Sequence, residues 1–233
     1  MASFLPASEP VTAAARFLIP LLEGIDARRG GVRLAVAGGS AMAALGPLRR
    51  GLKPGVWGRV RLTWVDERCV PGTDPESNRG AAYRDGHLDP DDAPRLEVPL
   101  YLDGETPVEA CARVAAALDS GFQGGLDLLL LGMGEDGHIA SLFPGGFFGR
   151  IGDPPVFAVP DSPKPPRRRI TLSLALLAGA EAAVLVAAGA GKRDALQRLA
   201  AGDPALPGSA LRSLVVVTEA DLIPPGATRT MPV

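Results

Sequence analysis

The residues best suited to catalysis lie in one glycine-rich segment that directly follows the apolar run 126–131. It reads Gly132-Met133-Gly134-Glu135-Asp136-Gly137-His138. A histidine titrates near neutral pH and can act as a general base, and a carboxylate two residues away can orient its ring or stabilise its charged form. Asp136 and His138 are therefore a candidate general-base pair. The structural alternative is a surface Asp-Gly turn with an incidental histidine.

The same segment also matches the pattern G-x-G-x-x-G, so a dinucleotide site has to be considered. That fingerprint needs a long helix after its glycines, and here Pro144 comes too soon after His138 for such a helix. We therefore reject the dinucleotide interpretation.

A second glycine-rich turn, Gly38-Gly39-Ser40, follows the apolar run 32–37 and opens a predicted helix. Glycines permit a tight turn and close backbone approach, and the free amides at the positive end of a helix attract an anion such as phosphate. An ordinary strand-to-helix turn, with Ser40 as the N-cap, would also explain this pattern.

Three charged residues, Asp66-Glu67-Arg68, come directly after the apolar run 60–65. Charged runs are usually solvated, and a surface loop would account for one or two of these residues. Downstream, Asp74, Ser77 and Asn78 lie in a Pro-rich, turn-forming stretch that can fold back over the same edge of a sheet. The cluster by itself only suggests a site.

Two further basic residues flank later apolar runs. Arg169 precedes Ile170-Thr171-Leu172, and Lys192 follows Gly189-Ala190-Gly191. Either could supply positive charge to a phosphate, arginine as a fork and lysine as a point charge. Exposed basic residues without a role are the alternative, which we expect for the neighbouring Arg167 and Arg168.

Other catalytic templates fail on inspection. A Walker A loop is excluded because Val186 stands where its first glycine belongs and Arg193 stands where Ser or Thr should be. Ser40 is no esterase nucleophile, since Met42 replaces the second glycine of G-x-S-x-G. The chain has two histidines and no H-E-x-x-H, so we expect no metal site. Water is then the expected nucleophile.

The elements that must position these residues alternate along the chain. A helix is predicted over 11–28, and short apolar runs bounded by glycine or charge predict strands at 32–37, 60–65, 126–131, 183–188 and 214–218. Helical patterns at 41–50, 107–118 and 192–200 separate them. This alternation predicts an α/β fold, with helices on both faces of a mostly parallel sheet. Apart from Arg169, the candidate residues follow the strands, where such sheets bind ligands.

Composition narrows the class of protein. The 233 residues are 46% hydrophobic and 21% charged, with a net charge of -2, which predicts one globular domain over 1–233 and no nucleic-acid partner. No apolar run is long enough to span a membrane and no secretory signal is visible, so we expect a cytoplasmic protein. Cys69 and Cys111 belong to no C-x-x-C pair, which favours two reduced thiols.

Taken in order, these segments resemble the 6-phosphogluconolactonase family, within the wider group that includes glucosamine-6-phosphate deaminases. The most specific segments are 64–71 with Ser77-Asn78, and 131–138 with 140–145; Pro165-Pro166, 169–172 and Gly191-Lys192 support them. The resemblance implies a three-layer α/β/α sandwich with a Rossmann-like sheet, no cofactor and no metal. It implies hydrolysis of 6-phosphoglucono-δ-lactone, a small sugar phosphate, in the oxidative pentose phosphate pathway.

The resemblance also implies roles for individual residues. His138 resembles the base that activates water, Asp136 would orient it, and Arg68 would hold the phosphate or stabilise charge on the carbonyl oxygen. The residues expected to bind the phosphorylated substrate are Gly38, Gly39, Ser40, Asp66, Arg68, Arg169 and Lys192. Ala41-Met42 departs from the family's usual Thr or Ser followed by Pro, so one hydroxyl donor to the phosphate is missing. We expect a monomer or a weak homodimer.

Two alternatives remain. Glucosamine-6-phosphate deaminases share the G-x-G-x-D-G-H loop but continue into Ala-Phe-Asn-Glu-Pro, whereas here Ser141-Leu142-Phe143-Pro144 follows, and Arg68 replaces the tyrosine of their Asp-Glu-Tyr. Both differences favour the lactonase. A non-catalytic sugar-phosphate sensor would not need to keep both Asp136 and His138.

Overall fold

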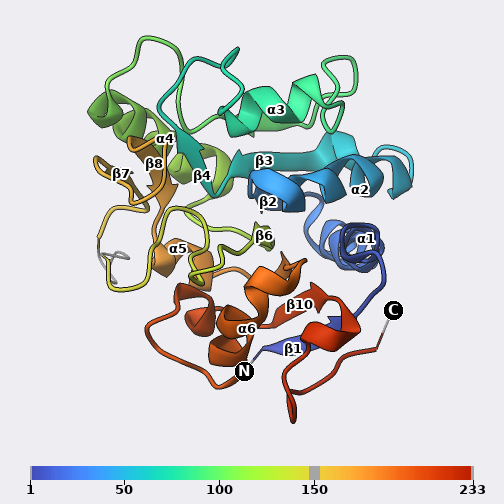
Figure 1. The fold of residues 1–233 in the computed structure, drawn as a ribbon. Coiled ribbons are helices and arrows are strands. Elements are labelled where there is room, and N and C mark those ends of the chain that lie inside the picture. The colour runs from blue at the N-terminus through green and yellow to red at the C-terminus, as the bar shows by residue number, and fades with distance from the viewer. Residues whose placement is uncertain (1, 147–152, 232–233) are drawn as a thin grey trace.

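The computed structural model describes residues 2–146 and 153–231, and its centre is a seven-stranded sheet. The strands are β1 (Ser3–Pro6), β2 (Val32–Val36), β3 (Val60–Trp64), β5 (Leu96–Val98), β6 (Leu128–Gly132), β9 (Ala182–Val186) and β10 (Leu214–Thr218). Their order is β1-β10-β9-β6-β2-β3-β5, and every neighbouring pair is parallel. Figure 1 shows blue β1 beside red β10, so the first and last strands of the chain are neighbours.

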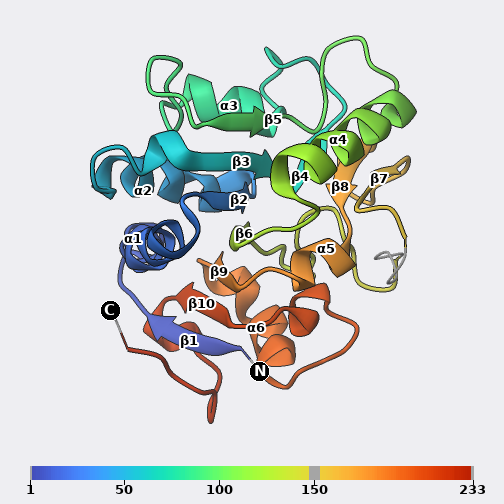
Figure 2. The same cartoon turned by 180° about the vertical axis from the view of Figure 1, so that it is seen from behind.

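Helices pack against this sheet and give the predicted layered α/β architecture, seen from the other side in Figure 2. The α-helices are α1 (Pro10–Arg29), α2 (Leu45–Gly51), α3 (Asn78–Arg84), α4 (Pro107–Phe122), α5 (Leu174–Ala178) and α6 (Arg193–Ala200). The 3-10 helices are η1 (Gly39–Ala44), η2 (Trp57–Arg59), η3 (Ala190–Lys192), η4 (Pro207–Ala210) and η5 (Ala220–Leu222). α1 contacts β2, β9, β10 and α2, whereas α4 contacts β5. No described helix combines the length and apolar character that a membrane crossing requires.

Local sequence signals explain where the two longest helices begin and end. Pro107 follows the N-cap of α4, and Thr106 and Glu109 form a reciprocal capping box that satisfies two free amides. α1 starts at Pro10 and stops at Gly30, which takes the left-handed conformation with φ of 68°. These helices could therefore be predicted from the sequence.

The central strands are apolar along their whole length because both of their faces are covered. Val32, Leu34 and Val36 of β2 and Leu128 to Leu131 of β6 have no exposed surface. Burying each such side chain stabilises the fold by about 1.5–3 kcal/mol before the cost of ordering it. The sheet thus provides a rigid base for the loops at its carboxyl edge.

A second, antiparallel sheet was not predicted. It contains β4 (Asp66–Arg68), β7 (Val156–Val159) and β8 (Arg169–Leu172) in the order β4-β8-β7. The alternative interpretation of 66–68 as a surface loop does not hold, since pairing with β8 and buried hydrogen bonds accommodate the charged residues. In this pairing Arg68 lies opposite Arg169, which places two of the candidate residues side by side.

Two predicted helices differ in detail from the structure. The helix expected over 41–50 begins as η1 and becomes regular only at Leu45, so that Pro47, which has no N–H to donate, falls in the first turn of α2. Lys192, expected as the first residue of a helix over 192–200, is instead the last residue of η3, immediately before α6. The edge strands β1 and β5 were also missed, because each is short and lacks a marked apolar period.

Candidate active site

The candidate residues gather around one cavity of about 300 Å³ at the carboxyl edge of the parallel sheet. Its lining includes Gly38, Gly39, Ser40, Asp66, Arg68, His138, Arg169 and Lys192. Of the nine residues expected from the sequence, Asp136 alone is outside this lining, and it lies behind His138. A larger hollow of about 420 Å³ between β1 and α1 contains none of them.

His138 and Asp136 form the pair that the sequence predicts. The His138 Nδ1 atom lies 2.6 Å from Asp136 Oδ1. Because a carboxylate only accepts hydrogen bonds, Nδ1 carries the hydrogen in this arrangement, and Nε2 keeps the lone pair that a base needs. Gly134 makes the close fold possible, since a Cβ atom there would lie 2.1 Å from Nδ1. Gly137 supplies the turn between the partners with φ of 88°.

The surroundings of His138 favour its neutral, basic form. Burial lowers the pKa of His138, and the hydrogen bond to Asp136 offsets this only in part. The Phe143 ring covers the imidazole, with ring centroids 4.5 Å apart. Burial opposes ionisation of Asp136 too, but its bond to His138 and the charge of Lys164 bring its pKa below the usual value. At neutral pH the pair is therefore a carboxylate beside a neutral imidazole.

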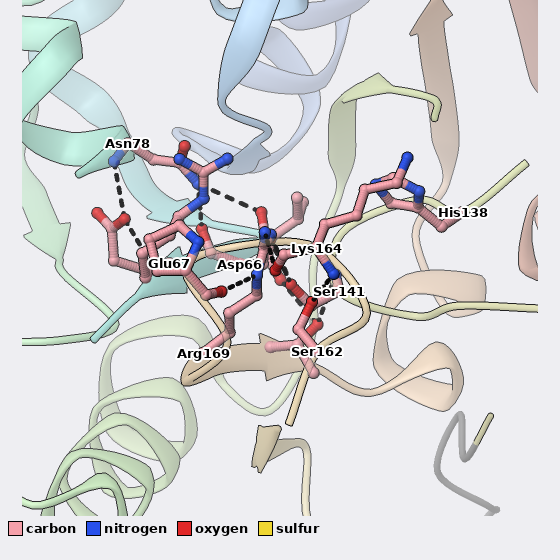
Figure 3. Close-up of polar contacts among 12 residues, drawn as sticks. Asp66, Glu67, Asn78, His138, Ser141, Ser162, Lys164 and Arg169 are labelled. Carbon is pink, nitrogen blue, oxygen red and sulfur yellow. Dashed lines mark hydrogen bonds and ion pairs between the residues drawn. The ribbon is translucent and has the colours of Figure 1, made fainter. Parts of the chain in front are cut away.

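Lys164 is a cavity residue that the sequence reasoning missed. Its Nζ atom lies 3.4 Å from Asp136 Oδ1, and Figure 3 shows its side chain extending toward His138. Burial lowers the pKa of the other cavity lysine, Lys192, while Glu135 acts in the opposite direction and Lys164 adds to the lowering. The sequence did offer a signal, because Lys164 directly precedes Pro165-Pro166, a pair that supports the family resemblance.

The glycine-rich turn forms one wall of the cavity. Gly39 takes a left-handed conformation with φ of 65°, and Ser40 is exposed on the cavity side without capping a helix. The alternative interpretation of Ser40 as an N-cap is therefore wrong. A Cβ at Gly38 would lie 1.9 Å from Asn78 Oδ1, so only glycine lets Asn78 approach this turn. The downstream stretch does fold back over this edge, as expected.

Glu67 and Asn78 brace the site from beneath. The Glu67 carboxylate accepts hydrogen bonds from the backbone amides of Asn78 (2.7 Å) and Arg79 (2.8 Å) and from Ser77 Oγ (3.3 Å). Burial raises the pKa of Glu67, while these amide hydrogen bonds oppose the shift. Asn78 Nδ2 donates to the Asp66 carbonyl at 2.9 Å. Glu67 thus anchors the start of α3 and holds Asn78 against the glycine turn.

Arg68 has a donor left for a ligand. Its Nη1 atom donates to the Glu76 carbonyl at 2.6 Å. Its Nε atom is buried and has no hydrogen-bond partner among the described residues. A ligand in the cavity cannot reach this buried Nε atom. The donor that remains for a ligand is Nη2, which makes no hydrogen bond with the described residues.

Arg169 lines the cavity, but the protein already uses its donors. Its Nε atom donates to the Pro166 carbonyl at 2.9 Å, and Nη2 donates to the carbonyls of Pro165 (3.0 Å) and Lys164 (3.2 Å). Nη1 lies 3.5 Å from Asp66 Oδ2 and 3.4 Å from Ser141 Oγ. Figure 3 shows this cluster beneath Lys164. Arg169 therefore fixes the backbone that presents Lys164. Arg167 and Arg168 are exposed, as expected.

The residues of this cavity lie within a segment that matches a known protein family. Residues 6–217 match the family described as glucosamine-6-phosphate isomerases/6-phosphogluconolactonase. The chain belongs to this family. The resemblance recognised in the sequence is thereby confirmed. Other members include a 6-phosphogluconolactonase of Caulobacter vibrioides, 37% identical over 206 residues that cover 85% of this chain and 86% of that protein. A 6-phosphogluconolactonase of Rattus norvegicus is 37% identical over 184 residues, covering 75% and 71%.

Solved structures of the family share the fold. The 6-phosphogluconolactonase of Thermotoga maritima superposes with a TM-score of 0.79 over 94% of this chain and 99% of its own, at 23% identity. A monomeric glucosamine-6-phosphate deaminase superposes with a TM-score of 0.74 over 95% and 98%, at 19% identity. Both reactions therefore occur on this family's fold, and the site has to decide between them.

Proposed function

We propose that this protein is a 6-phosphogluconolactonase that hydrolyses 6-phosphoglucono-δ-lactone to 6-phosphogluconate. The observation that carries the proposal is the neutral His138, backed by Asp136, at a cavity that also presents Arg68, Lys164 and Lys192. A base and a cluster of cations in one cavity suit an uncharged ester that carries a phosphate. The relatives named 6-phosphogluconolactonase, at 37% identity, support the same conclusion.

In the proposed mechanism, His138 Nε2 takes a proton from a water molecule as that water attacks the lactone carbonyl carbon. Negative charge then develops on the carbonyl oxygen. When the tetrahedral intermediate collapses, the bond from the carbonyl carbon to the ring oxygen breaks, and His138 returns the proton to that oxygen. Asp136 keeps the proton of the imidazole on Nδ1 and stabilises the imidazolium formed in between. No cofactor is needed for this sequence of steps.

The basic residues would bind the charged parts of the substrate. We assign the 6-phosphate to Lys164, Lys192 and the turn at Gly38, Gly39 and Ser40, whose side chains and backbone border the cavity. Arg68 has an unpaired Nη2 donor, which would serve either the phosphate or the carbonyl oxygen as it gains charge. Asp66 and Arg169 would contribute to the wall around the substrate.

In the deaminase pattern Ala-Phe-Asn-Glu-Pro, the acid stands where this chain has Phe143. The Phe143 ring instead lies against the His138 imidazole, with ring centroids 4.5 Å apart, so this position presents no carboxylate to a substrate. The lactonase is therefore the better-supported reaction. Placement in the cytoplasm and in the oxidative pentose phosphate pathway belongs to the same proposal, as do a single domain over 1–233 and a monomeric or weakly dimeric state.

The test is the rate of acid release from freshly generated 6-phosphogluconolactone, corrected for spontaneous hydrolysis. We expect rapid hydrolysis by the wild type, loss of most of it in His138→Ala, and full activity in His87→Ala. His87 is a matched control because it does not line the cavity. Wild-type activity no greater than background would refute the proposal and direct attention to deamination of glucosamine 6-phosphate, then to sugar-phosphate binding alone. Unchanged turnover in His138→Ala would refute the assigned base.

A further inference from the structure

A second polar cavity, of about 290 Å³, lies at the amino-terminal ends of strands of the parallel sheet. Arg33 and Arg61 stand near the starts of β2 and β3, and Arg95 directly precedes β5. These three arginines and Arg29, at the end of α1, line the cavity, and Asp127 is the one carboxylate in that lining. The candidate active site occupies the other ends of the same strands, so the two cavities are separate.

Asp127 is fully used by two of the four arginines. Its side chain is only 2% exposed, and its carboxylate accepts hydrogen bonds from Arg33 Nε (3.0 Å), from the Arg33 backbone amide (2.9 Å) and from Arg29 Nη1 (2.9 Å). Arg33 Nη1 donates to the Phe122 carbonyl at the end of α4, and Arg29 Nη2 donates to Glu181. Arg29 and Arg33 therefore have structural partners that account for their charges.

Arg61 and Arg95 have no such partners. Neither makes a side-chain hydrogen bond or ion pair with the residues that the structure describes, although both line the cavity. The Arg61 guanidinium lies over Gly31, where a Cβ atom would come within 3.1 Å of Arg61 Nη1 and 2.9 Å of the Arg59 carbonyl oxygen. Glycine at this position thus leaves room for the guanidinium at the cavity wall.

We propose that this second cavity binds a compact phosphate-bearing anion, with Arg61 and Arg95 as its principal ligands. Guanidinium groups pair with phosphate oxygens through two parallel hydrogen bonds, and here two of them share one hollow in which the carboxylate is already neutralised. The cavity has room for more than one phosphoryl group, which favours a diphosphate over a single phosphate. Phosphoryl groups are the shared chemistry, whether they belong to inorganic pyrophosphate or to a nucleotide.

The test is a calorimetric titration of inorganic pyrophosphate into the wild type and three variants. Arg61→Gln/Arg95→Gln removes the proposed ligands, Lys164→Gln/Lys192→Gln weakens anion binding at the candidate active site, and Arg212→Gln removes an exposed charge beside β10, outside the cavity lining. We expect the pyrophosphate Kd of this site to rise at least about tenfold in the first variant, as the loss of charged hydrogen bonds implies, and to stay unchanged in the other two. Lactone hydrolysis should be unaffected by Arg61→Gln/Arg95→Gln.

Wild-type binding that survives in Arg61→Gln/Arg95→Gln but disappears in Lys164→Gln/Lys192→Gln would overturn the proposal, as would the absence of any binding. A second variant, Arg61→Lys/Arg95→Lys, guards against misfolding of the glutamine variant, because it keeps both charges. It should bind several-fold more weakly than the wild type, and unchanged affinity would contradict the role of the guanidinium forks.

Titration with ADP separates the sources of the anion. Tighter binding than pyrophosphate supports a nucleotide, and equal or weaker binding supports an inorganic diphosphate.

Discussion

Asp136 and Asp66 both follow apolar runs that end at the same cavity, yet their surroundings differ. The Asp136 side chain is 40% exposed, and its contacts are His138 and Lys164. The Asp66 side chain is 8% exposed and contacts Ser141 (2.6 Å), Asn78 (3.3 Å) and Arg169 (3.5 Å). Asp136 serves a residue that can react, whereas Asp66 joins three segments of the fold.

The same contrast separates the cations. Lys164 and Lys192 border the cavity. The Lys164 ammonium has only its 3.4 Å contact with Asp136, and the Lys192 ammonium has no hydrogen bond with the described residues, whereas the guanidinium of Arg169 already donates to three consecutive carbonyls. Position beside a cavity therefore does not by itself assign a residue to the substrate. The hydrogen-bonding capacity that remains after the fold is satisfied is the better criterion.

Replacing each aspartate by asparagine, which has the same shape but no charge, tests whether Asp136 and Asp66 have different roles. We expect Asp136→Asn to lower kcat about 10³-fold, or about 4 kcal/mol of barrier, because an asparagine amide can donate to Nδ1 and so favour the wrong tautomer of His138. Steady-state hydrolysis of the lactone measures this, and thermal unfolding should show an unchanged Tm.

Asp66→Asn is the matched control. It should lower stability by about 1–3 kcal/mol through the loss of buried charged hydrogen bonds, with a much smaller effect on kcat. Equal losses of kcat in the two variants would contradict the assignment of Asp136 to catalysis and of Asp66 to stability.

The next largest effect is expected on stability, at Arg169, which the sequence suggests as a phosphate ligand. We expect Arg169→Gln to reduce the free energy of unfolding by about 3 kcal/mol, because it leaves the buried Asp66 and the carbonyls of the 164–166 segment without their donor. Chemical denaturation measures this loss. A variant as stable as the wild type but with a strongly raised KM would instead make Arg169 a substrate ligand.

A smaller effect is expected at Lys192. Lys192→Ala should raise KM about tenfold and change kcat little, since a phosphate far from the reacting bond contributes mainly uniform binding. The unphosphorylated lactone is the control, because its hydrolysis should not respond to the substitution. If wild-type enzyme hydrolysed both lactones with equal kcat/KM, the assignment of a phosphate site would fail.

The smallest effect is expected on the pH dependence of catalysis, and it tests whether Phe143 keeps the pKa of His138 low. Burial lowers the pKa of His138, so removing the ring that covers it, in Phe143→Leu, should let that pKa rise toward its ordinary value. The base acts in its deprotonated form, so kcat/KM should fall a few-fold near pH 6 and stay unchanged near pH 8, as a pH profile would show. Phe143→Tyr keeps the ring and should restore the wild-type profile. An acid limb that stays in place or moves to lower pH would argue against this role of Phe143.

Much of the fold and part of the site could be predicted from the sequence, because they depend on short-range patterns. Apolar runs bounded by glycine or charge predict the five long strands of the parallel sheet, and all the candidate residues except Arg169 follow from their position after those strands. The approach of Asp136 to His138 is local as well, since the glycines on either side of Asp136 allow the chain to fold back within a few residues.

Only the tertiary structure decided which polar residues already have hydrogen-bond partners within the fold. Ser141 reaches Asp66 across 75 positions, and Arg169 reaches Asp66 across 103. Such pairings depend on how β4 and β8 come together, and no spacing in the sequence encodes that register. For the same reason the sequence reveals neither that Lys164 borders the cavity nor that the Arg169 guanidinium has partners within the fold. Composition and periodicity determine where chains turn, but the packed fold determines which donors remain free.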